Sequence, residues 1–370
     1  MKVQTKVESL DAEMAFRSMK VTLGDVEFAT PIKASKADVP VGPVNEIFRE
    51  LDKATLEAIV NSTKTETLVA DQLLRKLRPG LNLFFVQYPD FVAPSVKEMG
   101  ALADIQYQRS DVVITPLFPG IGRTRVADAI SDDLVLWNSR FIDEVETLNN
   151  KTIIGMVPIF AHRFVLQTVV DALVDRDVVH FAIDMQGRVF QDTWMRAFLK
   201  ILKAHRLTDT SMLYLINARE GMLSQKAEEV LAKDFITPAY SVDVIGHNHV
   251  APPGMARIAD SRKPKPPPPP PSWREFSSAS YGYKRILLNP VATKYGVSID
   301  RARALIKGRN ISRQYGETLV MQQALAEAGT LLPHIGKKKM VTAKLLESLK
   351  KFRRETLESE RTKQTSLFGI

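Results

Sequence analysis

The chain contains no cysteine among its 370 residues. That absence excludes disulfide bonds, a thiol nucleophile and any zinc site built from cysteine thiolates. Long apolar runs are also missing, because no uninterrupted apolar stretch reaches the roughly 18 residues that a membrane-spanning helix needs. Residues 1–10 mix charged and polar side chains and lack the apolar core of a secretory signal. We therefore expect a cytoplasmic protein.

Short apolar runs are abundant in the first two-thirds of the chain, and amphipathic stretches of helical character separate most of them. A parallel sheet buried on both faces requires strands of this kind, joined by helices. About eight such units favour an α/β fold of the (β/α)8 barrel type, and a chain that is 45% hydrophobic can fill its core. The predicted strands are Val26–Ile32, Thr67–Asp71, Leu81–Tyr88, Asp111–Thr115, Lys151–Phe160, Val178–Asp184, Ser211–Asn217 and Tyr240–Gly246.

Two carboxylates stand at predicted strand ends, Asp90 after the third run and Asp243 within the last. Barrel enzymes carry their chemistry where the strands end, so we expect these two side chains to face each other across the barrel mouth. Each also has a structural interpretation. Asp90 follows Pro89 and would suit a turn or a helix cap, and Asp243 would suit a buried ion pair.

Charge divides the chain unevenly. Residues 256–370 hold 23 Lys and Arg against 9 Asp and Glu, and residues 1–255 hold 28 against 33. The proline run Pro264–Pro271 cannot continue a helix or a central strand, so it marks a boundary. We predict a catalytic barrel over 1–255, a proline-rich linker or insertion over 256–280, a basic helical region over 281–360, and a tail over 361–370.

The basic region is expected to bind the phosphates of a nucleic acid, because clustered Lys and Arg release counterions there. We expect loop at Ser272–Ser278 and helices over Ile299–Lys307, Gly316–Ala328 and Val341–Glu360, with Gly308 ending the first helix. The predicted contacts are Lys284, Arg285, Arg301, Arg303, Lys307 and Arg309.

Strand order and several short segments resemble the queuine-type tRNA-guanine transglycosylase superfamily, whose members are (β/α)8 barrels. The likeness covers roughly residues 21–250 and is distant. It is carried by Leu23–Glu27 with Thr30–Pro31, Ser110–Ile114, Gly155–Val157, Asp177–Ile183, Tyr214–Ile216 and Tyr240–Gly246.

Departures from the family pattern point to one branch. The family's cysteine-based zinc site cannot form here, Thr115–Leu117 replaces its guanine-reading segment, and Pro158 replaces a glutamine. The DNA 7-deazaguanine transglycosylases of phages and genomic islands are the more similar branch. Because that zinc site cannot form, we expect no metal and no cofactor. The resemblance implies two substrates, DNA and a 7-deazaguanine base.

The resemblance also implies site roles. Asp243 would attack the sugar and form an aspartyl–glycosyl intermediate, while Asp90 would act as general acid and base. Asp184 occupies the family's base-binding turn, and Tyr88, Phe91 and His247 would contact a flipped base.

Three other functions fit the sequence. One is a tRNA-guanine transglycosylase-like enzyme. Another is a metal-dependent barrel hydrolase, because His247 and His249 form a His-x-His pair that Asp90 and His162 would complete. The third is a non-catalytic, clamp-tethered DNA-binding protein.

The final residues, QTSLFGI, place an apolar Leu-Phe pair after a charged segment. The string QTSLF resembles the pentapeptide that binds bacterial sliding clamps, with Gln364, Leu367 and Phe368 at the anchoring positions. A sliding clamp is therefore an expected partner.

Deleting residues 364–370 should abolish recovery of the protein in a pull-down with purified sliding clamp, because the anchoring side chains are removed. Activity on nucleic acid in vitro should remain measurable. Undiminished recovery of the truncated chain would refute the tether.

Overall fold

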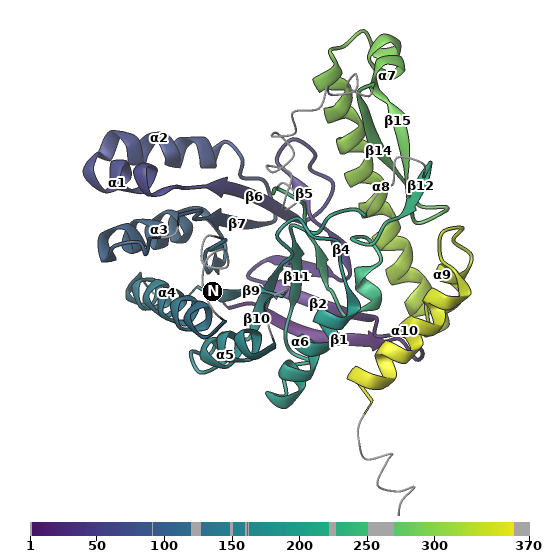
Figure 1. Cartoon of the computed structure of the whole chain (residues 1–370), viewed down its shortest axis with the longest axis horizontal. Helices are drawn as coiled ribbons and strands as arrows, with labels where there is room; N and C mark the ends of the chain where they lie inside the picture. Colours follow the sequence, from purple (N-terminus) through teal and green to yellow (C-terminus); the bar gives the residue numbers. More distant parts are fainter. Residues whose placement is uncertain are drawn as a thin grey trace, which may run out of the picture.

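The computed structural model describes residues 2–90, 92–119, 127–148, 151–159, 161, 163–221, 227–250 and 270–358. They form a mixed α/β protein built around a central parallel sheet (Figure 1). In this part of the chain, no helix is both long and apolar enough to cross a membrane.

Short parallel strands form the centre of the molecule. The strands are β4 (Ile32–Lys33), β5 (Ser35–Lys36), β6 (Val44–Glu50), β7 (Leu81–Gln87), β8 (Val113–Ile114), β9 (Ile153–Pro158), β10 (His180–Asp184), β11 (Leu213–Ile216) and β13 (Val244–Ile245). Six of them pair in the order β4-β13-β11-β10-β9-β8, and the other three in the order β5-β6-β7. Ala34 alone separates β4 from β5, and a parallel bridge joins Leu83 of β7 to Val112, next to β8.

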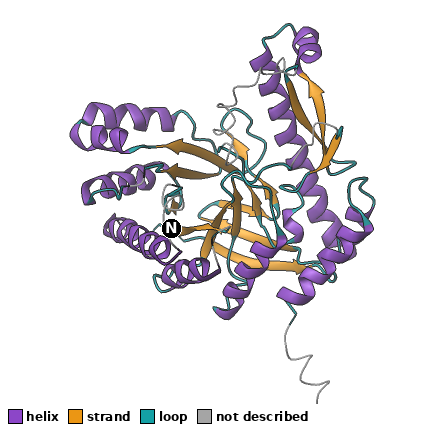
Figure 2. Ribbon diagram, in the orientation of Figure 1, coloured by secondary structure: helices purple, strands orange, loops and turns teal. Residues whose placement is uncertain are grey.

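Helices alternate with these strands and cover their outer face (Figure 2). They are α1 (Lys53–Asn61), α2 (Thr63–Leu74), α3 (Val96–Arg109), α4 (Ala127–Leu148), α5 (Arg163–Val174) and α6 (Asp192–Ala204). Leu166, Val170 and Leu173 recur at helical spacing on α5 and are buried in the same cluster as Phe181 of β10. The strands are thereby buried on their outer side.

An antiparallel sheet covers the amino ends of the parallel strands. Its strands are β1 (Gln4–Leu10), β2 (Arg17–Leu23) and β3 (Val26–Ala29). Met19 and Val21 of β2 share a buried cluster with Phe85 and Tyr214, which point inward from the parallel strands. The inner face of the sheet is therefore also filled, as a parallel sheet requires.

A second antiparallel sheet lies beside the carboxyl end of the parallel strands. It has the order β12-β15-β14 and consists of β12 (Glu229–Leu231), β15 (Gly282–Leu287) and β14 (Ser272–Ser277). A 3-10 turn, η2 (Thr237–Ala239), precedes β13. The remaining helices are α7 (Leu288–Tyr295), α8 (Ile299–Ala328), α9 (Leu332–Gly336) and α10 (Ala343–Thr356). The long helix α8 packs against β14 and β4 and so joins this sheet to the central one (Figure 1).

The parallel sheet and five of the predicted strand positions are confirmed, at β7, β8, β9, β10 and β11. The strand predicted over Thr67–Asp71 is wrong, because this run lies within α2, whose N-cap Ser62 accepts a hydrogen bond from the amide of Thr65. Val26–Ile32 is divided between β3 and β4, and only Val244–Ile245 of the last predicted strand is extended in the sheet. The second parallel strand is β6, where Asn45, Glu46 and Arg49 interrupt the apolar pattern.

The carboxyl-terminal prediction needs two corrections. The helices expected on either side of Gly308 are one continuous helix, α8, since neither Gly308 nor Gly316 adopts the left-handed conformation that ends helices. Residues 272–277 of the expected linker form β14, and residues 282–287 of the expected helical region form β15. Both strands pair with one another, and β12, from the expected barrel, completes their sheet.

Candidate functional site

Asp243 lies at the amino end of the parallel strands, directly before β13. Its carboxylate is fully buried and accepts hydrogen bonds from Arg17 Nε at 2.9 Å and Nη2 at 2.5 Å. The backbone amide of Leu213, the first residue of β11, donates to the same carboxylate at 2.7 Å. With its oxygens occupied in this way, Asp243 joins β2 to two parallel strands.

Asp90 lies past the opposite, carboxyl end of β7. Its Oδ2 accepts a hydrogen bond from the backbone amide of Lys53, the first residue of α1, at 2.5 Å. A carboxylate at a helix amino terminus satisfies a free N–H group and interacts favourably with the helix dipole. The structure therefore does not bring Asp90 and Asp243 together, and the expectation that they face one sugar is wrong.

Asp243→Ala should lower the free energy of unfolding by about 3–5 kcal/mol, because it leaves the Arg17 guanidinium buried without its partner. Urea denaturation measures the change. Glu27→Ala is the matched control, since Glu27 pairs with Lys20 at the surface and its loss should be negligible. A loss below about 1 kcal/mol for Asp243→Ala would contradict a supporting role.

A buried carboxylate, Glu46 of β6, organises the interior at the carboxyl end of the strands. It is hydrogen-bonded to the Tyr214 hydroxyl and to His249 Nε2, and the His247 amide donates to it at 3.1 Å. Burial by itself would raise the pKa of Glu46, but the hydrogen bonds and charge of His249, together with Tyr214, hold that pKa below its ordinary value. Phe48 stacks on the His249 ring at a centroid distance of 4.3 Å, which fixes the ring in place.

Asp184 extends this polar network from the end of β10. Its Oδ1 accepts hydrogen bonds from Asn217 Nδ2 at 2.9 Å and from the Gln186 amide at 3.0 Å. Asn217 Oδ1 in turn accepts from the His249 amide. Burial raises the pKa of Asp184 to about 6. Asp184 is thus at a strand end as predicted, but its Oδ1 holds the turn and does not line the cavity described next.

A cavity of about 520 Å³ opens between the carboxyl ends of β4, β11 and β13 and the small sheet with α8. Six basic side chains line it against two carboxylates, Glu220 and Asp234, so it suits an anion. The basic residues are Lys33, Lys36, Arg219, Arg274, Arg285 and Lys307.

Glu220 and Asp234 form the carboxylate pair of the cavity. Burial raises the pKa of Glu220 to about 7, and the nearby charge of Asp234 adds to the shift. Asp234 is 7% exposed, and its Oδ2 accepts a hydrogen bond from the Tyr283 hydroxyl at 2.7 Å. Its Oδ1 has no hydrogen-bond partner of normal geometry among the described residues, although the backbone amides of Asp234 and Phe235 act to lower the pKa of this carboxyl. Burial raises the pKa of Asp234 as well, while Lys33 and Tyr283 act in the opposite direction.

Two buried nitrogen atoms in the cavity lining also have no partner within the described ranges. They are Nε2 of His247 and Nε1 of Trp273. Burial and the nearby charges of Lys33 and Lys36 hold the pKa of His247 well below its ordinary value, so the ring is neutral at pH 7. Unpaired buried polar atoms are costly, and a bound water, ion or ligand in the adjoining cavity would satisfy them.

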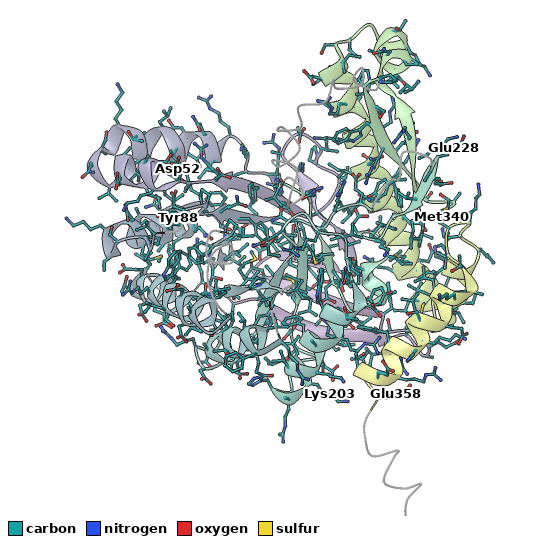
Figure 3. The ribbon with its side chains drawn as sticks, in the orientation of Figure 1. Asp52, Tyr88, Lys203, Glu228, Met340 and Glu358 are labelled. Atoms are coloured by element: carbon teal, nitrogen blue, oxygen red, sulfur yellow. The ribbon has the colours of Figure 1, made fainter. Side chains whose placement is uncertain are left out.

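Other predicted residues fall in different places. Tyr88 is buried near α3, packs on Phe118 and Trp137, and donates its hydroxyl to the Val92 carbonyl, so it is a core residue (Figure 3). Phe91 and His162 lie outside the described residues, as do the clamp-binding positions Gln364, Leu367 and Phe368.

The six predicted nucleic-acid contacts are spread over the small sheet and α8. Arg285 and Lys307 line the cavity, and Lys307 and Arg303 lie over the Trp273 ring at 4.8 and 5.5 Å. Arg309 lies over Tyr295 and 3.8 Å from a Glu275 oxygen. Lys284 and Arg301 are exposed.

Sequence reasoning missed Lys33, Lys36, Glu220, Asp234 and Trp273. The two lysines could have been predicted, because each lies within a short, largely buried strand, where a charged side chain rarely serves packing alone. Glu220 and Asp234 had none, since they lie in connections between strands.

A comparison with protein-family models finds no match, and a search of curated proteins finds none either. Within the described ranges, no group of three or more His, Asp and Glu side chains is placed to hold a metal ion.

Proposed function

We propose that this protein is a transglycosylase that exchanges guanine in DNA for a 7-deazaguanine base, and that its parallel strands close into a (β/α)8 barrel. Closure is supported by the strand pairings, since β4 and β5 are nearly continuous and pair with β13 and β6 respectively. At the other end of the series, β7 reaches β8 through the bridge between Leu83 and Val112. In such a barrel the site belongs at the carboxyl ends of the strands, where the cavity lies.

The observation that carries the proposal is the carboxylate pair in this cavity. Cleavage of an N-glycosidic bond passes through an oxocarbenium-like transition state, which one carboxylate stabilises or attacks while a second group moves a proton. Asp234 offers an unpaired oxygen, and Glu220 has a pKa of about 7, suited to proton transfer at neutral pH. These residues replace Asp243 and Asp90 in the proposed mechanism.

In the first half-reaction, Asp234 Oδ1 bonds to C1′ of the target nucleotide as the bond from C1′ to guanine N9 breaks. Glu220 gives its proton to the departing base. In the second half-reaction, N9 of the incoming base loses its proton to Glu220 and bonds to C1′, which releases Asp234. The neighbouring Lys33 cation favours the ionised form of Asp234 before attack.

The basic lining supports a nucleic-acid substrate. Lys36, Arg285 and Lys307 surround the cavity from three different elements, so phosphates on both sides of a target nucleotide would meet positive charge. The unpaired Nε1 of Trp273 and Nε2 of His247 would donate to or accept from the base or the sugar.

Cells that express the protein and are supplied with a 7-deazaguanine precursor should contain 7-deazaguanine nucleosides in their DNA. Mass spectrometry of nucleosides from digested DNA and RNA measures this directly. Asp234→Asn should reduce incorporation by about 10³-fold or more, because the amide cannot form the intermediate.

Glu347→Gln is the matched carboxylate control, since Glu347 is 70% exposed on α10 and does not line the cavity. It should incorporate as much modified base as the wild type. Modified nucleosides found only in RNA would show that the substrate is RNA, as for the tRNA-guanine transglycosylases, and not DNA. Their absence from both, with the wild-type protein folded and the precursor present, would contradict base exchange.

Exchange in vitro should slow as the pH rises above about 7, because Glu220 then loses the proton that the departing base needs. Glu220→Gln should lower the rate about 10²-fold or more, and the rate of this variant should no longer fall as the pH rises above about 7. A rate that stays constant from pH 6 to pH 9 in the wild-type enzyme would assign the proton transfer to another group.

A further inference from the structure

Lys33 is a buried amine at the carboxyl end of β4, and the proposed base exchange gives it only an electrostatic role. It is 3% exposed and lines the cavity. Its Nζ donates a hydrogen bond to the Gly246 carbonyl oxygen. Gly246 also lines the cavity, so this hydrogen bond holds the amine at the cavity wall.

The surroundings of Lys33 make the amine a nucleophile. Burial lowers the pKa of Lys33 to about 8, and the charge of Lys36 acts in the same direction. The carboxylates that face it, Asp234, Glu46 and Glu220, oppose that shift. An amine with this pKa is unprotonated in about a tenth of the molecules at pH 7, far more than an ordinary lysine, and nucleophilic attack on a carbonyl requires this form.

We propose that Lys33 forms an imine with the C1′ aldehyde of a phosphate-bearing sugar, namely the ring-opened deoxyribose of an abasic site in DNA. This inference rests on the proposed function, because it places the sugar of a nucleic acid in the same cavity. The amine reacts with the aldehyde, and the other five basic side chains of the lining would bind the flanking phosphates. It adds an activity that base exchange does not need.

The chemistry balances with groups already in the cavity. The Lys33 Nζ lone pair bonds to C1′, and the carbonyl oxygen takes a proton from Glu220. The Asp234 carboxylate accepts a proton from the nitrogen. The C1′ hydroxyl then takes the proton held by Asp234 and leaves as water, while the nitrogen lone pair forms the C=N bond of the protonated imine. Borohydride delivers hydride to the imine carbon and converts it to a stable secondary amine.

The test uses the full-length protein and an oligonucleotide that carries one abasic site, with sodium borohydride present. A covalent protein–DNA species should form on a denaturing gel, and peptide mapping should locate the adduct on Lys33. Lys33→Arg keeps the positive charge but cannot form the imine, so trapping should fall at least tenfold. Lys200→Met, which removes an exposed lysine of α6, should leave trapping unchanged.

A second arm replaces the oligonucleotide with ribose 5-phosphate. Trapping of DNA at Lys33 supports the proposal as stated. Trapping of the free sugar phosphate alone, adducts on other lysines, equal trapping by Lys33→Arg, or no trapping in either arm would overturn it. Base exchange is measured separately by nucleoside analysis, so either result can fail while the other stands.

Discussion

The arrangement of residues at the carboxyl end of the parallel strands depends on the hydrogen bonds of one buried carboxylate, that of Glu46. It is bonded to side chains or amides from β11 and from the segment after β13, and it sits on β6. The backbone at Gly246 packs tightly against Glu46: a Cβ atom at this position would lie 2.4 Å from a Glu46 oxygen and 2.6 Å from the Leu215 carbonyl oxygen. A buried charge with several donors is rigid, and that rigidity fixes the direction in which Lys33, His247 and the end of β13 face the cavity.

The two ends of the parallel strands use acidic residues for different purposes. At the amino end, Asp243 is saturated by Arg17 and by a backbone amide, so it contributes to stability. At the carboxyl end, Asp234 keeps one oxygen unpaired and Glu220 keeps a pKa near 7. This division follows the general behaviour of parallel sheets, in which ligands bind beyond the carboxyl ends of the strands.

Much of the central sheet could be predicted from the sequence, because continuous apolar runs such as Leu81–Gln87 and His180–Asp184 are typical of strands buried on both faces of a parallel sheet. The run at Thr67–Asp71 is too short to distinguish a strand from a turn of helix. Strand β6 was missed because its buried residues include polar side chains, Asn45 and Glu46. Asp243 was placed at the wrong end of the sheet because the last strand begins at Val244, after Asp243, and not at Tyr240. Strand boundaries are the feature that a sequence predicts least well. Three residues predicted as contacts, His247, Arg285 and Lys307, do line the cavity. The Glu220–Asp234 pair could not be predicted, because it forms only when β12, β15 and α8 pack over the strands.

The small sheet has a consequence for how the protein can be divided. Its strand β12 precedes the last parallel strand, while β14 and β15 follow it. The backbone carbonyl of Glu228, directly before β12 and labelled in Figure 3, accepts a hydrogen bond from the Arg285 amide. Trp273 and Arg285 therefore reach the cavity from one side of the proline run, and Glu220 and Asp234 from the other. A fragment that ends or begins at the proline run would therefore lack part of the cavity lining. A fragment that keeps the whole cavity must therefore include both the parallel strands and the small sheet.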